Sequence, residues 1–136
     1  MPSVKRIDHI AMLVDDIDTT LSFWRDTLGM VLEGIKDMPS EKSVVAFLPI
    51  GDSEIELVQP TTSDSGLARY LEKRGPGLHH ICLQVDNIEA MLSTLKEKGI
   101  ELINETAIIS PSGKKYAFIH PKSANGVMVE LYELPG

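Results

Sequence analysis

The sequence repeats itself, and each copy carries one histidine and one glutamate at matching positions. Two stretches of the first half recur in the second half: residues 7–17 as 78–88, and residues 54–60 as 128–134. The first match pairs His9 with His80 (80 − 9 = 71), and the second pairs Glu56 with Glu130 (130 − 56 = 74). A duplicated unit should fold the same way twice. Its two copies together supply a His, Glu, His, Glu set that can close a two-fold metal site.

The overall composition is that of an ordinary globular protein. With 136 residues, 43% hydrophobic and 24% charged, the chain has the size of one domain that buries roughly two-thirds of its unfolded surface. Its apolar runs fall short of the ~20 residues of a membrane helix, and acidic residues interrupt the N-terminus, so neither a membrane span nor export is expected. The single cysteine, Cys82, cannot form an internal disulfide. This fits a cytoplasmic location.

A net charge of −7 argues against nucleic acid and anionic membranes as partners, because both carry the same sign of charge. Basic residues do gather in two places: Arg69, Lys73 and Arg74, and Lys114, Lys115 and Lys122. These groups can hold a phosphate-bearing ligand, or they are solvated side chains on a helix and a loop.

The periodicity predicts a βαβββ unit in each half. Residues 5–14 and 78–86 have the pattern of strands and are followed by helical spacing from Ile17 to Leu28 and from Ile88 to Leu95. The remaining strands are expected at about 30–35, 43–50 and 53–59, and at about 100–104, 115–120 and 126–133. Candidate caps are Asp16 or Asp18 with Gly29 for the first helix, and Asp86 or Asn87 with Gly99 for the second.

We therefore predict an α+β fold with two tandem βαβββ modules in a single domain over residues 1–136. Repeat 1 covers about 4–60, a linker with a short helix at 65–74 covers about 61–77, and repeat 2 covers about 78–134. Strand alternation places His9, Glu56, His80 and Glu130 opposite the apolar faces that pack on the helices. Their face should form the concave side of a curved mixed sheet around a metal-binding cleft.

Two imidazoles and two carboxylates suit one divalent transition metal ion with open positions for water or substrate. These ligand types do not separate cobalt, nickel, manganese, zinc and iron. Other polar residues rank lower: His79 and His120 as structural or surface groups, Cys82 as a buried, inert thiol, and Gln59 and Glu133 as outward-pointing side chains.

The paired modules resemble the vicinal oxygen chelate superfamily (glyoxalase, bleomycin resistance and dioxygenase proteins). Within it, four stretches over nearly the whole chain are similar to the methylmalonyl-CoA epimerase family: residues 7–11, 77–86, 98–100 and 118–131. The resemblance implies metal-dependent epimerisation of an acyl-CoA substrate at C2, cobalt as the expected ion, and a homodimer. It also implies that Glu130 is both a metal ligand and a catalytic acid or base.

The second catalytic group implied by the resemblance lies on the strand before Glu56, where residues 43–47 contain no acid. Glu41, just upstream, is the residue expected to take this role, with Glu54 or a water molecule as alternatives. Two other functions stay open. Glyoxalase I uses the same four ligand positions to isomerise a thiol–methylglyoxal adduct, and some members of the superfamily only sequester small ligands.

Overall fold

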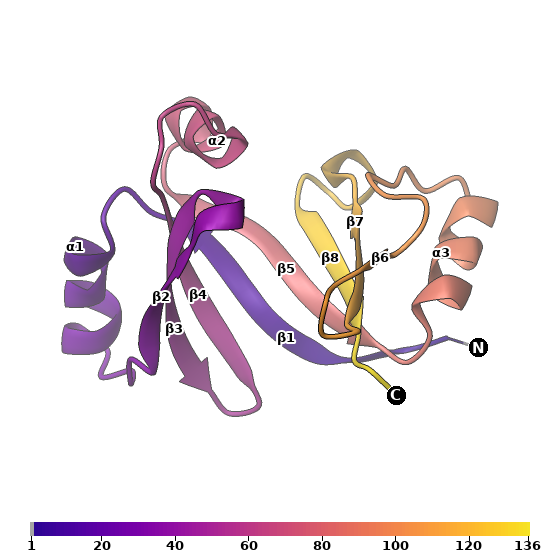
Figure 1. Cartoon of the computed structure of the whole chain (residues 1–136), viewed down its shortest axis with the longest axis horizontal. Coiled ribbons are helices and arrows are strands. Elements are labelled where there is room, and N and C mark those ends of the chain that lie inside the picture. The colour runs from indigo at the N-terminus through magenta and orange to yellow at the C-terminus, as the bar shows by residue number, and fades with distance from the viewer. Residues whose placement is uncertain (1) are drawn as a thin grey trace. The chain divides into compact units, whose positions relative to one another are not determined.

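The computed structural model describes residues 2–136, which contain three α-helices and eight β-strands (Figure 1). The α+β fold predicted from the sequence is confirmed. The chain forms two compact units, one of residues up to Asp8 together with His80–Gly136, the other of His9–His79. Within residues 2–136, no helix combines the length and the apolar character that a membrane span requires.

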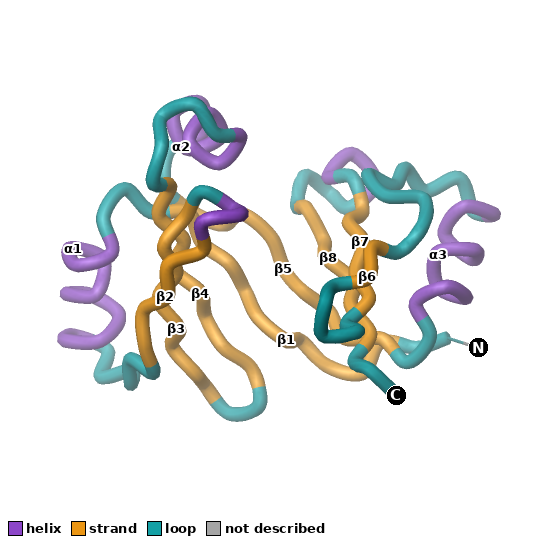
Figure 2. The backbone as a smooth tube through the Cα atoms, viewed as in Figure 1, coloured by secondary structure: helices purple, strands orange, loops and turns teal. Residues whose placement is uncertain are grey.

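The unit His9–His79 contains the first βαβββ module and the helix that follows it (Figure 2). Its elements are the second half of β1 (Val4–Leu13), α1 (Ile17–Leu21), a π-helix (Ser22–Thr27), β2 (Gly34–Met38), a 3₁₀ turn (Pro39–Glu41), β3 (Ser43–Ile50), β4 (Ser53–Pro60) and α2 (Gly66–Arg74). The strand order is β2-β3-β4-β1. Strands β1 and β4 are parallel, whereas the β2–β3 and β3–β4 pairs are antiparallel.

The other unit repeats this architecture with the second module. Its elements are the first half of β1, the part of β5 (Gly77–Val85) from His80 onward, α3 (Ile88–Glu97), β6 (Ile108–Ile109), β7 (Lys115–Ile119), a 3₁₀ turn (Pro121–Ser123) and β8 (Met128–Glu133). The strand order is β5-β8-β7-β6, again with one parallel pair, β5–β8, and antiparallel pairs beyond it. Each module therefore places its first strand beside its last strand in parallel.

The core between helix and sheet is built from the same repeat positions in both units. Six buried residues form each cluster: Val14, Ile17, Leu21, Ala46, Leu48 and Leu57 in one unit, and Val85, Ile88, Leu92, Ala117, Ile119 and Leu131 in the other. The first five pairs are offset by 71 residues and the last by 74 (131 − 57), the same offsets as the histidines and glutamates. Burial of these side chains against α1 and α3 places the histidines and glutamates on the opposite face of each sheet. In the unit His9–His79 that face also carries a second apolar cluster, which packs on α2 and consists of Ala11, Leu13, Val45 and Val58.

Helix ends follow the sequence signals, except inside the first helix. Asp16 and Asn87 cap α1 and α3, and Gly29 and Gly99 follow the helical segments with φ values of +81° and +75°. The prediction of one regular helix from Ile17 to Leu28 was wrong. After Leu21 the backbone widens into a π-helix, with a Leu28 N–H to Phe23 carbonyl bond five residues back.

Two strand predictions were also wrong. Strand β2 begins at Gly34 rather than at residue 30, because the Met30 N–H bonds to the Trp24 carbonyl at the end of the helix. The segment 100–104 forms no strand. Only Leu102 makes an isolated bridge there, and the Asn104 side chain accepts the Phe118 N–H that a neighbouring strand would have bonded.

Gln59 and Glu133 connect the last strand of each module to the start of its helix. The Ile17 N–H donates to Gln59 Oε1 at 2.9 Å, and the Ile88 N–H donates to Glu133 Oε1 at 2.8 Å. The prediction that these two side chains point outwards was therefore wrong. Both satisfy a helix N-terminal donor that would otherwise have no partner within the helix.

We expect Gln59→Ala to lower the free energy of unfolding by about 1–2 kcal/mol, because it removes the acceptor from the N–H of the buried Ile17. Urea denaturation measures the change. Gln59→Glu is the matched control, since it keeps an oxygen at this position as Glu133 does in the other module, and it should stay close to the parent protein. Equal stability of Gln59→Ala and the parent protein would contradict the capping role.

Candidate metal-binding residues

The first histidine–glutamate pair lies on the parallel strands β1 and β4. The register places Ala11 opposite Glu56, so His9, two residues earlier on the same face, is next to the Glu56 side chain. His9 Nδ1 lies 3.4 Å from Glu56 Oε2, with 8% and 17% of the two side chains exposed. Ala11 is fully buried.

The second pair lies on the parallel strands β5 and β8 with the same register. Cys82 is opposite Glu130, and His80 is again two residues before the residue that faces the glutamate. His80 Nε2 lies 3.2 Å from Glu130 Oε1, with 14% and 10% of the side chains exposed. Each unit thus brings one imidazole and one carboxylate together in a position that is nearly closed to water.

An aromatic ring flanks each glutamate, a feature that was not predicted from the sequence. Phe47 of β3 is the register partner of Glu56, and Phe118 of β7 is the partner of Glu130. The Phe118 ring also meets the His80 ring edge to face at 6.0 Å. The signal was present in the repeat, because 118 − 47 = 71. The rings place hydrocarbon beside each carboxylate and so limit its hydration.

Cys82 is fully buried next to Glu130, in agreement with its prediction as a buried thiol. Burial is the main reason that the pKa of the thiol is raised above its usual range, and the negative charge of Glu130 raises it further. The sulfur therefore stays protonated at neutral pH. The position of Cys82 is directly opposite Glu130, on the neighbouring strand β5.

A chain of side-chain contacts starts at Tyr132, which lies two residues after Glu130 on β8. The Tyr132 hydroxyl donates to Asp8 Oδ1 at 2.6 Å, and Asp8 Oδ1 also lies 3.0 Å from Arg6 Nη2. Arg6 Nε in turn donates to Gln84 Oε1 at 3.0 Å. Burial, followed by the contact with Asp8, raises the pKa of the Tyr132 phenol above its usual range. These contacts hold the Tyr132 ring in one position.

Four other polar residues were considered as site candidates from the sequence, and their surroundings differ. Glu41 is exposed in the 3₁₀ turn before β3, and Glu54 is half-buried as the register partner of His9. His79 packs edge to face on Tyr70 at 4.9 Å, and His120 Nδ1 accepts the Lys122 N–H. Both contacts agree with structural roles for these histidines.

Comparisons with known proteins agree with the repeated architecture. Residues 8–118 match the model of the Glyoxalase/Bleomycin resistance protein/Dioxygenase superfamily. The mitochondrial methylmalonyl-CoA epimerase of Mus musculus is 39% identical over 127 residues, which cover 93% of this chain and 71% of the mouse protein. An ethylmalonyl-CoA/methylmalonyl-CoA epimerase of Cereibacter sphaeroides is 35% identical over 133 residues, covering 96% of this chain and 99% of that protein.

Solved structures are also similar to this chain over nearly its whole length, and one of them contains a ligand. A variant of Streptomyces coelicolor methylmalonyl-CoA epimerase, in complex with 2-nitronate-propionyl-CoA, superposes with a TM-score of 0.83 at 30% identity. The match covers 97% of this chain and 96% of that one. Homologues of this protein thus bind acyl-CoA ligands. On these grounds the chain belongs to the Glyoxalase/Bleomycin resistance protein/Dioxygenase superfamily, within which it is similar to methylmalonyl-CoA epimerases.

Proposed function

We propose that this protein interconverts the two epimers of methylmalonyl-CoA by removing and returning the proton at C2. The observation that carries the proposal is the pair of equivalent His–Glu contacts, one in each module, in a chain that is 35–39% identical to two such epimerases over nearly its whole length. We further propose that His9, Glu56, His80 and Glu130 together bind one divalent metal ion.

The donor atoms are suited to such an ion. Two ligand atoms about 2.1 Å from one metal ion and at a right angle to each other lie about 3 Å apart. The two His–Glu separations, 3.4 and 3.2 Å, are close to this spacing. When bound, a divalent cation polarises the thioester and carboxylate oxygens of the substrate and makes the C2 proton more acidic.

Glu130 is the residue proposed to accept the C2 proton. Its carboxylate contacts the His80 imidazole, and Cys82 and Phe118 are its register partners on the two neighbouring strands. With 10% of the side chain exposed, little bulk water can compete for the proton, which favours return of the proton to the substrate. Inversion needs a second donor on the other side of C2.

For this second role we propose Glu41, with Glu54 or a water molecule as the alternatives. Glu41→Gln and Glu54→Gln distinguish them. Loss of epimerisation with one variant, while exchange of the C2 proton with solvent continues through Glu130, identifies that residue as the second group. Normal turnover in both variants would reject both carboxylates and leave water as the proton donor.

Proton NMR in D₂O tests the proposed reaction. We expect metal-loaded protein to replace the C2 proton of methylmalonyl-CoA with deuterium, and a chelator to stop this exchange. Cobalt is the first ion to use, with nickel, manganese, zinc and iron in parallel samples. The glutathione–methylglyoxal adduct serves as the competing substrate. Turnover of the adduct without C2 exchange would overturn the proposal in favour of a glyoxalase I reaction, and silence with both would favour ligand sequestration.

A further inference from the structure

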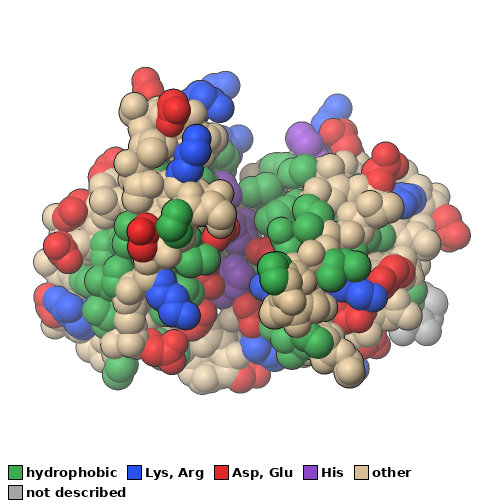
Figure 3. Space-filling model, in the orientation of Figure 1, with side chains coloured by type: hydrophobic (Ala, Val, Ile, Leu, Met, Phe, Trp, Pro, Cys, Tyr) green, Lys and Arg blue, Asp and Glu red, His purple; other side chains and the backbone are tan. Residues whose placement is uncertain are grey.

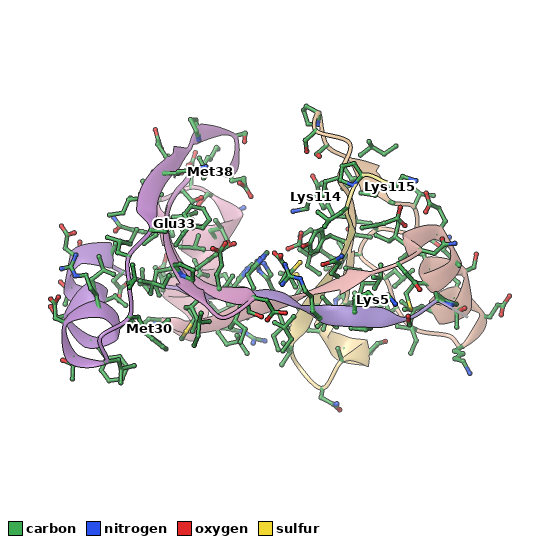
Figure 4. The ribbon with its side chains drawn as sticks, turned by 90° about the horizontal axis from the view of Figure 1, so that it is seen from below. Lys5, Met30, Glu33, Met38, Lys114 and Lys115 are labelled. Carbon is green, nitrogen blue, oxygen red and sulfur yellow. The ribbon has the colours of Figure 1, made fainter. Side chains whose placement is uncertain are left out.

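Two consecutive lysines at the start of β7 lie on opposite sides of the strand. Lys115 Nζ pairs with Glu89 Oε1 of α3 at 2.7 Å, so its side chain lies on the face covered by the helix. Lys114 Nζ instead lies 4.7 Å from the centre of the Tyr132 ring. Figure 4 shows the two labelled side chains leaving the chain in different directions. Lys114 is therefore on the face that also carries Glu130.

The Tyr132 ring, which the Lys114 ammonium group contacts, is itself held in place by its neighbours. Only 3% of Tyr132 is exposed, and its hydroxyl is held by Asp8, which is itself paired with Arg6. Tyr132 follows Glu130 by two residues on the same face of β8, a distance of roughly 7 Å along a strand. A cation above an aromatic ring is attracted to it without losing its charge. Lys114 thus contacts a ring that is next to the proposed proton acceptor on the same face of β8.

The charge of Lys114 is not balanced by a nearby carboxylate. Within its own unit, residues 2–8 and 80–136, no carboxylate oxygen lies within the 4.0 Å of an ion pair with Lys114, although the protein carries a net charge of −7 and acidic side chains occur across its surface (Figure 3). Lys115, one residue later, has such a partner. A half-buried cation on the ligand-bearing face, held by a ring alone, is suited to an anionic group of a ligand.

We propose that Lys114 binds the carboxylate of the acyl group, together with the proposed metal ion, and so adds to the selectivity of the site for thioesters of dicarboxylic acids. The proposal rests on the function proposed above, because it takes an acyl-CoA as the substrate. A methylmalonyl group carries a carboxylate one carbon from the thioester, whereas a propionyl group has none. Lys114 therefore contributes to the binding of the first and not of the second, and it acts as a specificity-determining residue rather than in proton transfer.

Isothermal titration calorimetry with malonyl-CoA and propionyl-CoA tests this assignment, because malonyl-CoA carries a carboxylate where propionyl-CoA carries a methyl group. In metal-loaded protein, Lys114→Ala should weaken malonyl-CoA binding roughly 10- to 100-fold, the range for a hydrogen bond to a charged group, and leave propionyl-CoA unchanged. Lys114→Arg should retain most of the preference. Lys115→Ala is the matched control and should bind both ligands as the parent protein does. Equal weakening of both ligands by Lys114→Ala, or no weakening, would overturn the proposal.

The C2 exchange measurement separates this inference from the proposed function. If the parent protein prefers malonyl-CoA through Lys114 but exchanges no C2 proton, the selectivity stands and the epimerase function fails. If exchange is rapid and Lys114→Ala keeps the full preference for malonyl-CoA, the epimerase function stands and the role of Lys114 is rejected.

Discussion

Glu130→Gln is expected to slow exchange of the C2 proton of methylmalonyl-CoA by about 10²–10⁴-fold, the usual contribution of a positioned acid or base, and to leave the fold intact. Glutamine has nearly the same shape and keeps an oxygen beside His80, so the contacts of β8 with Cys82 and Phe118 can persist. Its amide cannot take up the proton. The loss should therefore appear in kcat rather than in KM.

Glu133→Gln provides the matched control on the same strand. Its side chain keeps the oxygen that accepts the Ile88 N–H, and it belongs to the helix start rather than to the ligand pair. This variant should exchange the C2 proton at the rate of the parent protein. Metal content is measured in both variants. A Glu130→Gln protein that is metal-loaded and fully active would reject Glu130 as the proton acceptor.

His9→Ala and His80→Ala are expected to lower the bound metal at least tenfold at limiting metal concentration, and to do so to a similar extent. The reason is the equivalence of the two pairs: each histidine stands two residues before the register partner of its glutamate, and each removal takes one nitrogen donor from a set of four. Elemental analysis after dialysis against a weak chelator measures the metal. Activity should fall in parallel.

His79→Ala is the matched control for the histidines. His79 is next to His80 in the sequence, but its ring packs on Tyr70 within the unit His9–His79. Metal content should not change in this variant. If both His9→Ala and His80→Ala kept normal metal occupancy, the proposed four-ligand site would be wrong, and the His–Glu contacts would be simple ion pairs.

The repeat made much of the fold predictable from the sequence. The 71-residue offset that pairs His9 with His80 also pairs Ala46 with Ala117 and Leu48 with Ile119, so both cores are built from equivalent positions. Alternation along each strand correctly separated these apolar residues from the histidines and glutamates. Within each unit, the histidine and the glutamate of one module do lie side by side.

What could not be predicted depends on contacts between residues distant in the chain. The Asn104 side chain accepts the Phe118 N–H in place of a strand backbone, and the local sequence pattern does not predict this. The bond between Tyr132 and Asp8 joins residues 124 positions apart. The contact between Lys114 and the Tyr132 ring was not predicted for the same reason. Alternation assigns a face to a residue but does not show which neighbours its side chain contacts.

The bonds from Ile17 to Gln59 and from Ile88 to Glu133 give each half of the proposed site a built-in spectroscopic reporter. In each module the accepting side chain stands three residues after the glutamate of the pair, on the same strand. A small displacement of that strand on ion binding would change the length of one amide hydrogen bond, and amide proton shifts are sensitive to such lengths. Two backbone signals could thus follow metal loading at the two modules separately.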